Sequence, residues 1–146
     1  MVTSRPRPAE QDSLVDTLVQ TAFATMAVLN KLGAENDLSL TQLRVLGILR
    51  DRRLRMTALA DYLGLEKSSM TGLVDRAEKR GLLQRAPNAG DGRAVDVFLT
   101  SDGAELVDRL RSHIEQSLSP MTNELSPTEQ RRLQTLLERI LAATEP

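Results

Sequence analysis

The sequence predicts a mainly α (α+β) fold, a winged helix-turn-helix with N- and C-terminal dimerisation helices. Three observations lead to this prediction. Apolar residues recur at helical spacing through most of the 146 residues. Two short segments joined by Gly64 have the spacing of a helix-turn-helix. Directly after them, apolar residues alternate with a period of two beside a glycine-rich loop, which is typical of a β-hairpin.

Composition excludes several classes of protein. The chain has no cysteine and a single histidine, so it lacks cysteine nucleophiles and offers little to a metal ion. We therefore expect no catalytic residue, no metal and no cofactor. Three aromatic residues are too few to stack the bases of single-stranded nucleic acid. No apolar run approaches the roughly 20 residues that span a bilayer, and no signal segment is visible, so a cytoplasmic protein without membrane contact is expected.

Charge is distributed unevenly along the chain. Residues 41–93 hold 11 basic and six acidic residues, a net charge of +5, whereas the remainder carries −6. A basic middle between acidic ends favours a polyanionic partner for the middle. A chance fluctuation among solvated surface charges remains the alternative.

The N-terminal part predicts an arm followed by a long helix. Residues 1–11 contain two prolines and no apolar periodicity, so we expect a flexible arm before a domain of residues 12–143. A first helix is predicted over residues 13–32, with Gly33 as its stop. Its apolar stripe is wider than one small neighbour requires, which predicts contact with a partner chain.

Two further helices are predicted between residues 39 and 63. A capping box at residues 39–42 starts a helix through Arg50 that is apolar on nearly all sides and should be buried. Thr57 is the expected N-cap of a short helix over residues 58–63, which Gly64 ends. Between them lies a segment that is predicted to form a solvated, arginine-rich turn, with contact to a nucleic-acid backbone as the alternative for its arginines (Arg50, Arg52, Arg53 and Arg55).

The next helix, predicted over residues 67–80, has two different faces. One face is apolar and should pack on the preceding helix (Met70, Leu73, Val74 and Ala77). The other face carries short hydroxyls and cations that could meet phosphates or base edges in a major groove, or else could be solvent-facing filler (Lys67, Ser68, Ser69, Thr71 and Arg76). Crossing helices of this spacing are common in other contexts, so the motif alone has limited specificity.

A hairpin with strands at residues 82–86 and 94–99 should form the wing. Its tip is predicted to carry Arg85 and Arg93, and an arginine there can enter a narrow minor groove. Asp91 would repel phosphate, so it and Gly92 are assigned to supporting the wing, with Asp91 paired to Arg93 or Arg76. Whether Arg76 contacts phosphate or anchors the wing is left open.

Two closing helices complete the chain. One begins at Thr100 or Ser101 and carries His113, which is expected to be packed or at an interface. The other begins at a capping box over residues 126–129. Residues 12–36 and 101–143 are assigned to dimerisation, and residues 39–100 to the winged helix-turn-helix. The pair Ser101-Asp102 near His113 is better explained as a helix start than as a catalytic site.

The stretches LGLEKSSMTGLVDRAEKRGLLQR and DGRAVDVFLTSDG resemble the multiple-antibiotic-resistance regulator (MarR) family of transcription factors. The most specific signature is Asp91-Gly-Arg93 followed six residues later by Leu99-Thr100, and the resemblance covers residues 12–143. It implies a dimer made by the first and last two helices, a recognition helix in the major groove and a wing arginine in the minor groove. Two departures are Glu66, which is a poorer N-cap than Ser, Thr or Asp, and Gly72, which offers no base-reading side chain.

The leading hypothesis is therefore a dimeric, sequence-specific regulator of double-stranded DNA, a repressor released from a palindromic operator by a small molecule, with activation left open. The resemblance implies an effector pocket that takes small phenolic or aromatic acids, lined here by Phe23 and Met26 of the first helix together with parts of the second and fifth helices. The candidate DNA contacts are Lys67, Ser68, Ser69, Thr71, Arg76 and Arg93. The alternative is a winged-helix module that binds protein and not DNA.

Overall fold

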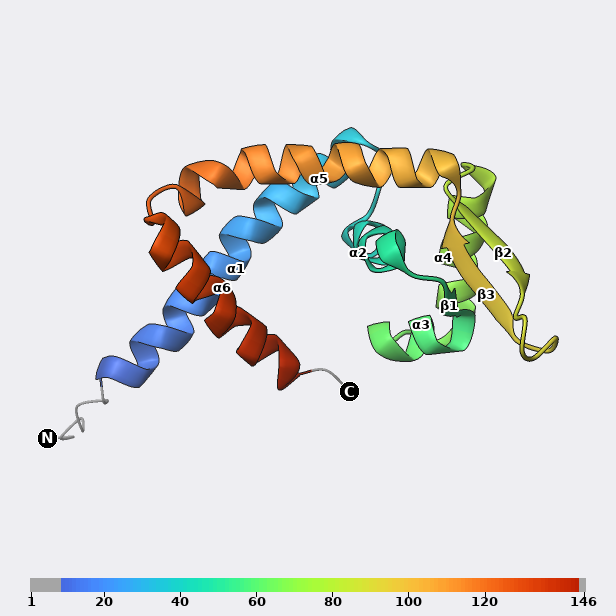
Figure 1. The fold of residues 1–146 in the computed structure, drawn as a ribbon, viewed down its shortest axis with the longest axis horizontal. Helices are drawn as coiled ribbons and strands as arrows, with labels where there is room; N and C mark the ends of the chain where they lie inside the picture. Colours follow the sequence, from blue (N-terminus) through green and yellow to red (C-terminus); the bar gives the residue numbers. More distant parts are fainter. Residues whose placement is uncertain (1–8, 145–146) are drawn as a thin grey trace, which may run out of the picture.

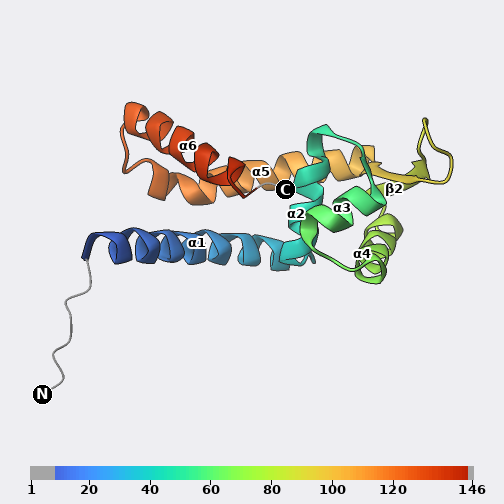
Figure 2. The same ribbon diagram turned by 90° about the horizontal axis from the view of Figure 1, so that it is seen from below.

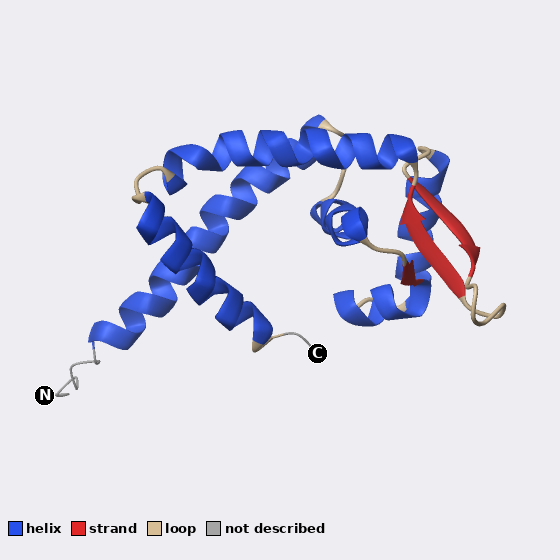
Figure 3. Cartoon of the chain, viewed as in Figure 1, coloured by secondary structure: helices blue, strands red, loops and turns tan. Residues whose placement is uncertain are grey.

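The structure, a computed structural model, describes residues 9–144 and shows an elongated, mainly helical chain (Figure 1). The elements follow in the order α1 (Ala9–Glu35), α2 (Leu40–Ile48), a 3₁₀ turn (Leu49–Asp51), β1 (Leu54–Arg55), α3 (Met56–Leu63), α4 (Lys67–Lys79), β2 (Leu83–Pro87), β3 (Val95–Leu99), α5 (Ser101–Thr122) and α6 (Pro127–Ala142). The helices α1, α5 and α6 extend to one side, and the segment from α2 to β3 forms the other end (Figures 1 and 3).

The three strands form one small antiparallel sheet in the order β1-β3-β2. In the hairpin, Leu83 pairs with Leu99 and Pro87 with Val95. The predicted hairpin is therefore present, one residue later than expected at each start. The two-residue strand β1 was not predicted. It pairs Leu54 with Val97 and Arg55 with Asp96, so the end of the segment expected to be a turn is part of the sheet, whereas its four arginines are exposed as expected.

The hydrophobic core lies where α2, α3, α4 and the sheet meet α5. The predicted apolar face of α4 is confirmed, because Met70, Leu73, Val74 and Ala77 are all buried. The expectation of a buried α2 is also confirmed by Val45 and Leu46. Each fully buried aliphatic side chain of this kind stabilises the fold by about 1.5–3 kcal/mol.

The boundaries of α1 correct two predictions. Residues 9–11, which were assigned to the arm, are helical, and residues 1–8 of that arm lie outside the described residues. Gly33 lies inside the helix and does not stop it. It is buried, and a Cβ there would lie 2.6 Å from the carbonyl oxygen of Leu38. The glycine is needed because the start of the next segment packs directly against the helix.

Helix starts follow their capping residues, with one exception. Both predicted capping boxes are confirmed, at Ser39 with Gln42 and at Ser126 with Glu129. Thr100 is the N-cap of α5, and its hydroxyl accepts a hydrogen bond from the Gly103 N–H. The prediction that Thr57 caps α3 is wrong, since that helix begins at Met56 and its N-cap residue makes no side-chain hydrogen bond.

Two hydrogen bonds from Thr100 hold the start of α5 against the turn before the wing. The Thr100 hydroxyl donates to the Gly81 carbonyl at 2.5 Å, and the Thr100 N–H donates to the Leu82 carbonyl at 3.1 Å. A Cβ on Gly103 would collide with that same Leu82 carbonyl. Nothing in the spacing of the sequence pointed to this glycine.

The helices α1 and α6 expose wide apolar faces. In Figure 2, α1 runs below α5 and α6 and is separated from α6. No residue of α6 is buried. The apolar side chains left exposed on these two helices are Leu14, Val15, Leu18, Val19, Phe23, Met26, Leu133, Leu136, Leu137, Ile140 and Leu141. Contiguous exposed apolar surface of this kind is typical of a protein interface.

Two further findings concern α5 and the question of membranes. His113 on α5 is exposed, so the expectation that it is packed within its own chain is wrong, and an interface role stays a prediction. Within residues 9–144, no helix combines the length and the apolar character needed to cross a bilayer.

Candidate nucleic-acid interface and neighbouring pocket

The outer face of α4 presents the predicted contact residues to solvent. Lys67, Ser68, Ser69 and Arg76 are exposed, and Thr71 is half-buried. The Thr71 hydroxyl donates to the Lys67 carbonyl at 2.8 Å, which leaves its oxygen able to accept only. Hydroxyls and cations in the first turns of a helix suit contact with phosphates and base edges.

Gly72 gives Arg76 room to lie back along α4. A Cβ at Gly72 would lie 3.3 Å from Nη1 of Arg76, the one heavy atom near it. Among the described residues, Arg76 makes no ion pair with a carboxylate of the wing. The prediction that Arg76 anchors the wing is therefore not supported by a contact, and phosphate contact stays a prediction.

The N-terminus of α4 lacks a side-chain cap, as expected from Glu66 in the N-cap position. Its first-turn N–H groups are left for water or for an anion. At the other end, Arg80 donates from Nη1 to the Asp37 carbonyl at 2.8 Å and from Nη2 to the Asn36 carbonyl at 2.9 Å. These bonds tie the end of α4 to the turn between α1 and α2.

The tip of the wing is shaped by two side chains that accept backbone hydrogen bonds. Asn88 Oδ1 accepts from the N–H groups of Gly90 at 2.9 Å and Asp91 at 3.0 Å. Asp91 Oδ1 in turn accepts from the N–H of Arg93 at 3.0 Å. The prediction of an ion pair between Asp91 and an arginine is wrong among the described residues. Its carboxylate holds the backbone of Arg93 and leaves that guanidinium exposed.

Arg85 is the residue that joins the wing to α4. Its Nη2 lies 2.5 Å from Asp75 Oδ1, and its Nε lies 2.8 Å from Glu78 Oε2. Partial burial opposes the charged form, but the hydrogen bond to Asp75 and the charge of Glu78 outweigh it and raise the pKa of Arg85. The prediction that Arg85 lies at the tip is wrong, since it sits in β2 and is engaged by two carboxylates.

A second polar cluster joins β1 to the wing. Arg53 donates from Nε to Asp96 Oδ2 at 2.9 Å, and its guanidinium lies 4.4 Å from the centroid of the Phe98 ring. Asn88 Nδ2 donates to the other carboxylate oxygen of Asp96 at 3.0 Å. The hydrogen bond from Asn88, followed by that from Arg53, lowers the pKa of Asp96, whereas burial opposes this. Arg53 therefore has a structural role, although its side chain, like those of Arg50, Arg52 and Arg55, is exposed as expected for the predicted turn.

A hollow between α4 and the wing brings three predicted contact residues together. It has a volume of about 240 Å³ and is lined by Lys67 and Thr71 from α4, Thr57 from α3 and Arg93 from the wing tip. Arg85, which is already paired with Asp75 and Glu78, also lines it. One face of the molecule thus gathers cations and hydroxyls from three separate segments of the sequence.

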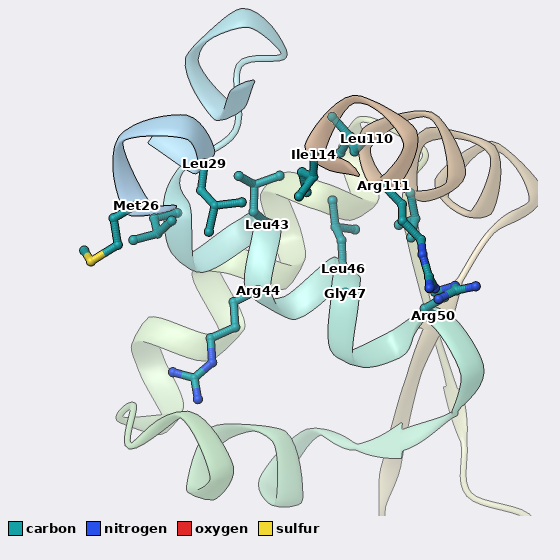
Figure 4. A pocket seen from close by; sticks show the side chains of 12 residues that line it. Met26, Leu29, Leu43, Arg44, Leu46, Gly47, Arg50, Leu110, Arg111 and Ile114 are labelled. Atoms are coloured by element: carbon teal, nitrogen blue, oxygen red, sulfur yellow. The ribbon is translucent and has the colours of Figure 1, made fainter. Parts of the chain in front are cut away.

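A larger pocket of about 470 Å³ lies between α1, α2 and α5 (Figure 4). Met26 lines it, as predicted, but Phe23 does not, and its side chain is 66% exposed on α1. Sequence reasoning missed the three arginines of the lining, Arg44, Arg50 and Arg111. The available signal was their position beside apolar residues on helices that were predicted to pack together.

No group of three or more His, Asp or Glu side chains that could hold a metal ion occurs among the residues that the structure describes. The chemistry of both sites is therefore that of arginines, hydroxyls and apolar walls, which suits binding and offers no nucleophile paired with a base.

Comparison with known proteins gives consistent results. The sequence model of the MarR family matches residues 36–94. The chain is 30% identical over 135 residues to the transcriptional regulator PecS of Dickeya dadantii, covering 87% of this chain and 79% of that protein. It is 27% identical over 132 residues to the homoprotocatechuate degradative operon repressor of Escherichia coli, covering 90% and 89%.

Solved structures share the fold. A mutant of MarR from E. coli in complex with operator DNA superposes with a TM-score of 0.71 at 24% identity, covering 94% of this chain and 99% of that one. NadR in complex with 4-hydroxyphenylacetate gives a TM-score of 0.74 at 23% identity, covering 96% and 97%.

Proposed function

Because the chain belongs to the MarR family of DNA-binding transcriptional regulators, we propose that it is a homodimeric repressor that binds a palindromic operator and leaves it when a small acid occupies the pocket. It is not an enzyme. The observation that carries the proposal is the cationic hollow between α4 and the wing, where Lys67, Thr71 and Arg93 lie on one face. We propose a cytoplasmic location, because the operator DNA that the protein would bind lies there.

In the proposed complex, α4 lies in the major groove and the wing tip in the minor groove. Lys67, Ser68, Ser69 and Thr71 would contact phosphates and base edges, and Arg76 would contact the backbone. The exposed guanidinium of Arg93 would enter the minor groove, where the negative potential is strongest when the groove is narrow. Asp91 and Gly92 support the tip without touching DNA.

The proposed dimer uses the apolar faces of α1 and α6, together with α5. Leu137 and Ile140 of α6 are 40% and 49% exposed in the single chain, and Leu14 of α1 is 72% exposed. A second copy is the partner that would cover all of these side chains at once under two-fold symmetry. The two copies of α4 would then face successive turns of the duplex.

The proposed effector is a small phenolic or aromatic acid that binds in the pocket between α1, α2 and α5. NadR has been solved with 4-hydroxyphenylacetate, and one relative is a homoprotocatechuate degradative operon repressor. The pocket volume of about 470 Å³ suits a molecule of this size. Its apolar walls and cationic rim suit an apolar body with one acid group.

Selection of bound duplexes from a random library, followed by footprinting, tests the DNA-binding proposal. We expect an inverted repeat whose half-sites lie about one helical turn, roughly 34 Å, apart. Protection of a single half-site, or of a direct repeat, would contradict the two-fold arrangement. Failure to retain any duplex at low salt would instead favour a winged-helix module that binds protein.

A further inference from the structure

Among residues 13–144, Asp96 is the one charged residue that is buried. It belongs to β3, the middle strand of the sheet, where it pairs with Arg55 of β1 and Ala86 of β2. The next residue, Val97, is part of the hydrophobic core, so Asp96 points to the opposite face of the sheet. A buried carboxylate destabilises a fold unless hydrogen bonds compensate for the lost water. The partners of Asp96 therefore decide what it does.

The two oxygens of Asp96 bind side chains from two different segments. Oδ2 accepts from Nε of Arg53, just before β1, at 2.9 Å, and Oδ1 accepts from Nδ2 of Asn88, just after β2, at 3.0 Å. The bond from Asn88, followed by that from Arg53, holds the pKa of Asp96 below its ordinary value of 3.8, so the group is ionised near neutral pH. An ionised carboxylate only accepts hydrogen bonds, so it fixes Nδ2 of Asn88 toward itself and Oδ1 toward the wing tip.

The oxygen of Asn88 organises the backbone of the tip. It accepts from the N–H groups of Gly90 at 2.9 Å and Asp91 at 3.0 Å. The Asp91 carboxylate then accepts from the N–H of Arg93 at 3.0 Å. The backbone that carries Arg93 is therefore oriented through the amide of Asn88, and that amide is oriented by Asp96.

Arg53 connects these bonds to the body of the domain. Its guanidinium lies 4.4 Å from the centroid of the Phe98 ring, which is on the same face of β3 as Asp96. Among the described residues, no buried side-chain nitrogen or oxygen lacks a hydrogen-bond partner. A buried ion pair adds little net stability compared with apolar side chains of similar volume. A fully hydrogen-bonded set does, however, hold its members in one orientation.

We propose that Asn88, Asp96 and Arg53 are positioning residues that set the direction in which Arg93 enters the minor groove. This inference rests on the proposed function and deepens it, because it assigns the orientation of the wing arginine to side chains that do not touch DNA. A tip that is already oriented loses less conformational freedom when it binds. The three residues raise operator affinity only through Arg93.

Asp96→Asn separates this role from electrostatics. Removal of a negative charge by itself favours binding to DNA. In the variant, the new amide turns its oxygen to Arg53 and its NH₂ group to the NH₂ group of Asn88, so the tip loses its support. We expect operator affinity to fall about three- to tenfold, the effect of one lost hydrogen bond. The control Asp61→Asn removes the same charge from the exposed surface of α3 and should not weaken binding.

The exchange Asn88→Asp, Asp96→Asn reverses the direction of one hydrogen bond. The amide at position 96 then donates to the carboxylate at position 88, whose second oxygen accepts from the tip, and the amide oxygen still accepts from Arg53. We expect the exchange to bind operator about threefold or more tightly than Asp96→Asn, although it carries one more negative charge. Charge alone predicts the opposite order.

The Arg93→Ala background tests whether the effect passes through the wing arginine. There, Asp96→Asn should change affinity by less than about twofold, because no guanidinium is left to orient. Asn88→Ala leaves the pair of Arg53 and Asp96 intact, and it should weaken binding in the parent but not in this background. It carries the test if thermal unfolding shows that Asp96→Asn is not folded at the temperature of the titrations.

Fluorescence anisotropy with the duplex obtained by selection measures all of these affinities. Unchanged or tighter binding by folded Asp96→Asn, no recovery in the exchange, or equal losses with and without Arg93 would each overturn the inference. If the parent binds operator and one of these results is found, the positioning role is wrong and the DNA-binding proposal stands. If the parent binds no duplex, the proposed function itself fails.

Discussion

Arg85 of β2 lies 2.5 Å from Asp75 of α4, and this ion pair joins the wing to the helix that carries most of the candidate DNA contacts. A second carboxylate, Glu78, binds the same guanidinium 2.8 Å away. Asp75 and Glu78 are one helical turn apart, so one planar side chain bridges both. The orientation of the wing is thus set by a residue that need not touch DNA.

Replacing Arg85 should weaken DNA binding indirectly. We expect Arg85→Gln to make operator binding less favourable by about 1 kcal/mol, because the wing is no longer held against α4. Arg85→Lys should show a similar loss, since lysine keeps the charge but lacks the planar fork. Fluorescence anisotropy over a series of salt concentrations checks this. Full affinity in the lysine variant would mean that only the charge matters.

The contact between Gly103 and Leu82 predicts a strong effect on stability. Gly103→Ala would place a methyl group against the Leu82 carbonyl, so we expect the free energy of unfolding to fall by roughly 1–3 kcal/mol. Gly47→Ala is the matched control, because a Cβ there meets no atom within 4 Å. That change should be neutral or stabilise α2 by up to about 1 kcal/mol. Chemical unfolding at one protein concentration measures both; equal effects would contradict the packing argument.

Local sequence determined much of this fold and little of its long-range pairing. The capping boxes at Ser39 and Ser126 and the apolar face of α4 could be predicted, because each depends on residues within two helical turns. The partners of Arg53 and Arg85 could not be predicted. Arg53 pairs with Asp96, 43 residues away, and the choice among many surface carboxylates depends on how β1 joins the sheet.

The candidate site, like the fold, could be predicted from the sequence only in part. The outward position of the candidate contact residues on α4 could be predicted, since periodicity alone shows which side chains point away from the core. Sequence reasoning erred at Phe23, because a wide apolar stripe on α1 does not reveal which part of it faces its own chain and which faces solvent. It also missed Gly103, whose requirement comes from a close approach of two backbone segments.

Acid should weaken the fold partly through Asp96. Its pKa is lowered in the folded state by the hydrogen bonds from Asn88 and Arg53, so its stabilising contribution is present above the ordinary value of 3.8. That contribution is lost as the pH falls from this value through the lowered folded pKa. Asp96→Asn should therefore be less stable than the parent near neutral pH, and the difference should shrink in acid. Melting temperatures across this range test the sign; a difference that grows as the pH falls would contradict it.

The exposed stripe of α6 should be a dimer interface. Leu137→Glu would place a charge in that stripe, and we expect it to raise the dissociation constant of the dimer by at least tenfold, because the charge loses its water on association. Thr135→Glu, on the opposite side of the helix, is the control and should leave association unchanged. Light scattering over a dilution series measures both. A folded 16.1 kDa monomer of the parent protein at micromolar concentration would refute the dimer.

Arg93→Ala should fold normally and bind DNA less tightly, since its exposed side chain adds little to the core. We expect a loss of about 1–3 kcal/mol in binding free energy and a shallower dependence of log affinity on log salt, by up to one or two units for the dimer. Arg93→Lys, which keeps the charge, should retain most of the salt dependence. Unchanged affinity of Arg93→Ala at physiological salt would exclude the wing from binding.

The hydrogen bond from the Arg93 N–H to Asp91 separates two roles for that carboxylate. Asp91→Asn keeps an oxygen that can accept this bond, so we expect operator affinity to stay at the parent level or to rise as a negative charge leaves the DNA face. Asp91→Ala removes the acceptor and loosens the tip, so affinity should fall. The double variant Asp91→Ala, Arg93→Ala should lose less binding free energy than the sum of the two single losses, because both changes act through the side chain of Arg93. Anisotropy titrations of the five proteins decide the matter. If Asp91→Asn weakened binding as much as Asp91→Ala, the negative charge itself would be required and the backbone hydrogen bond would not explain the wing.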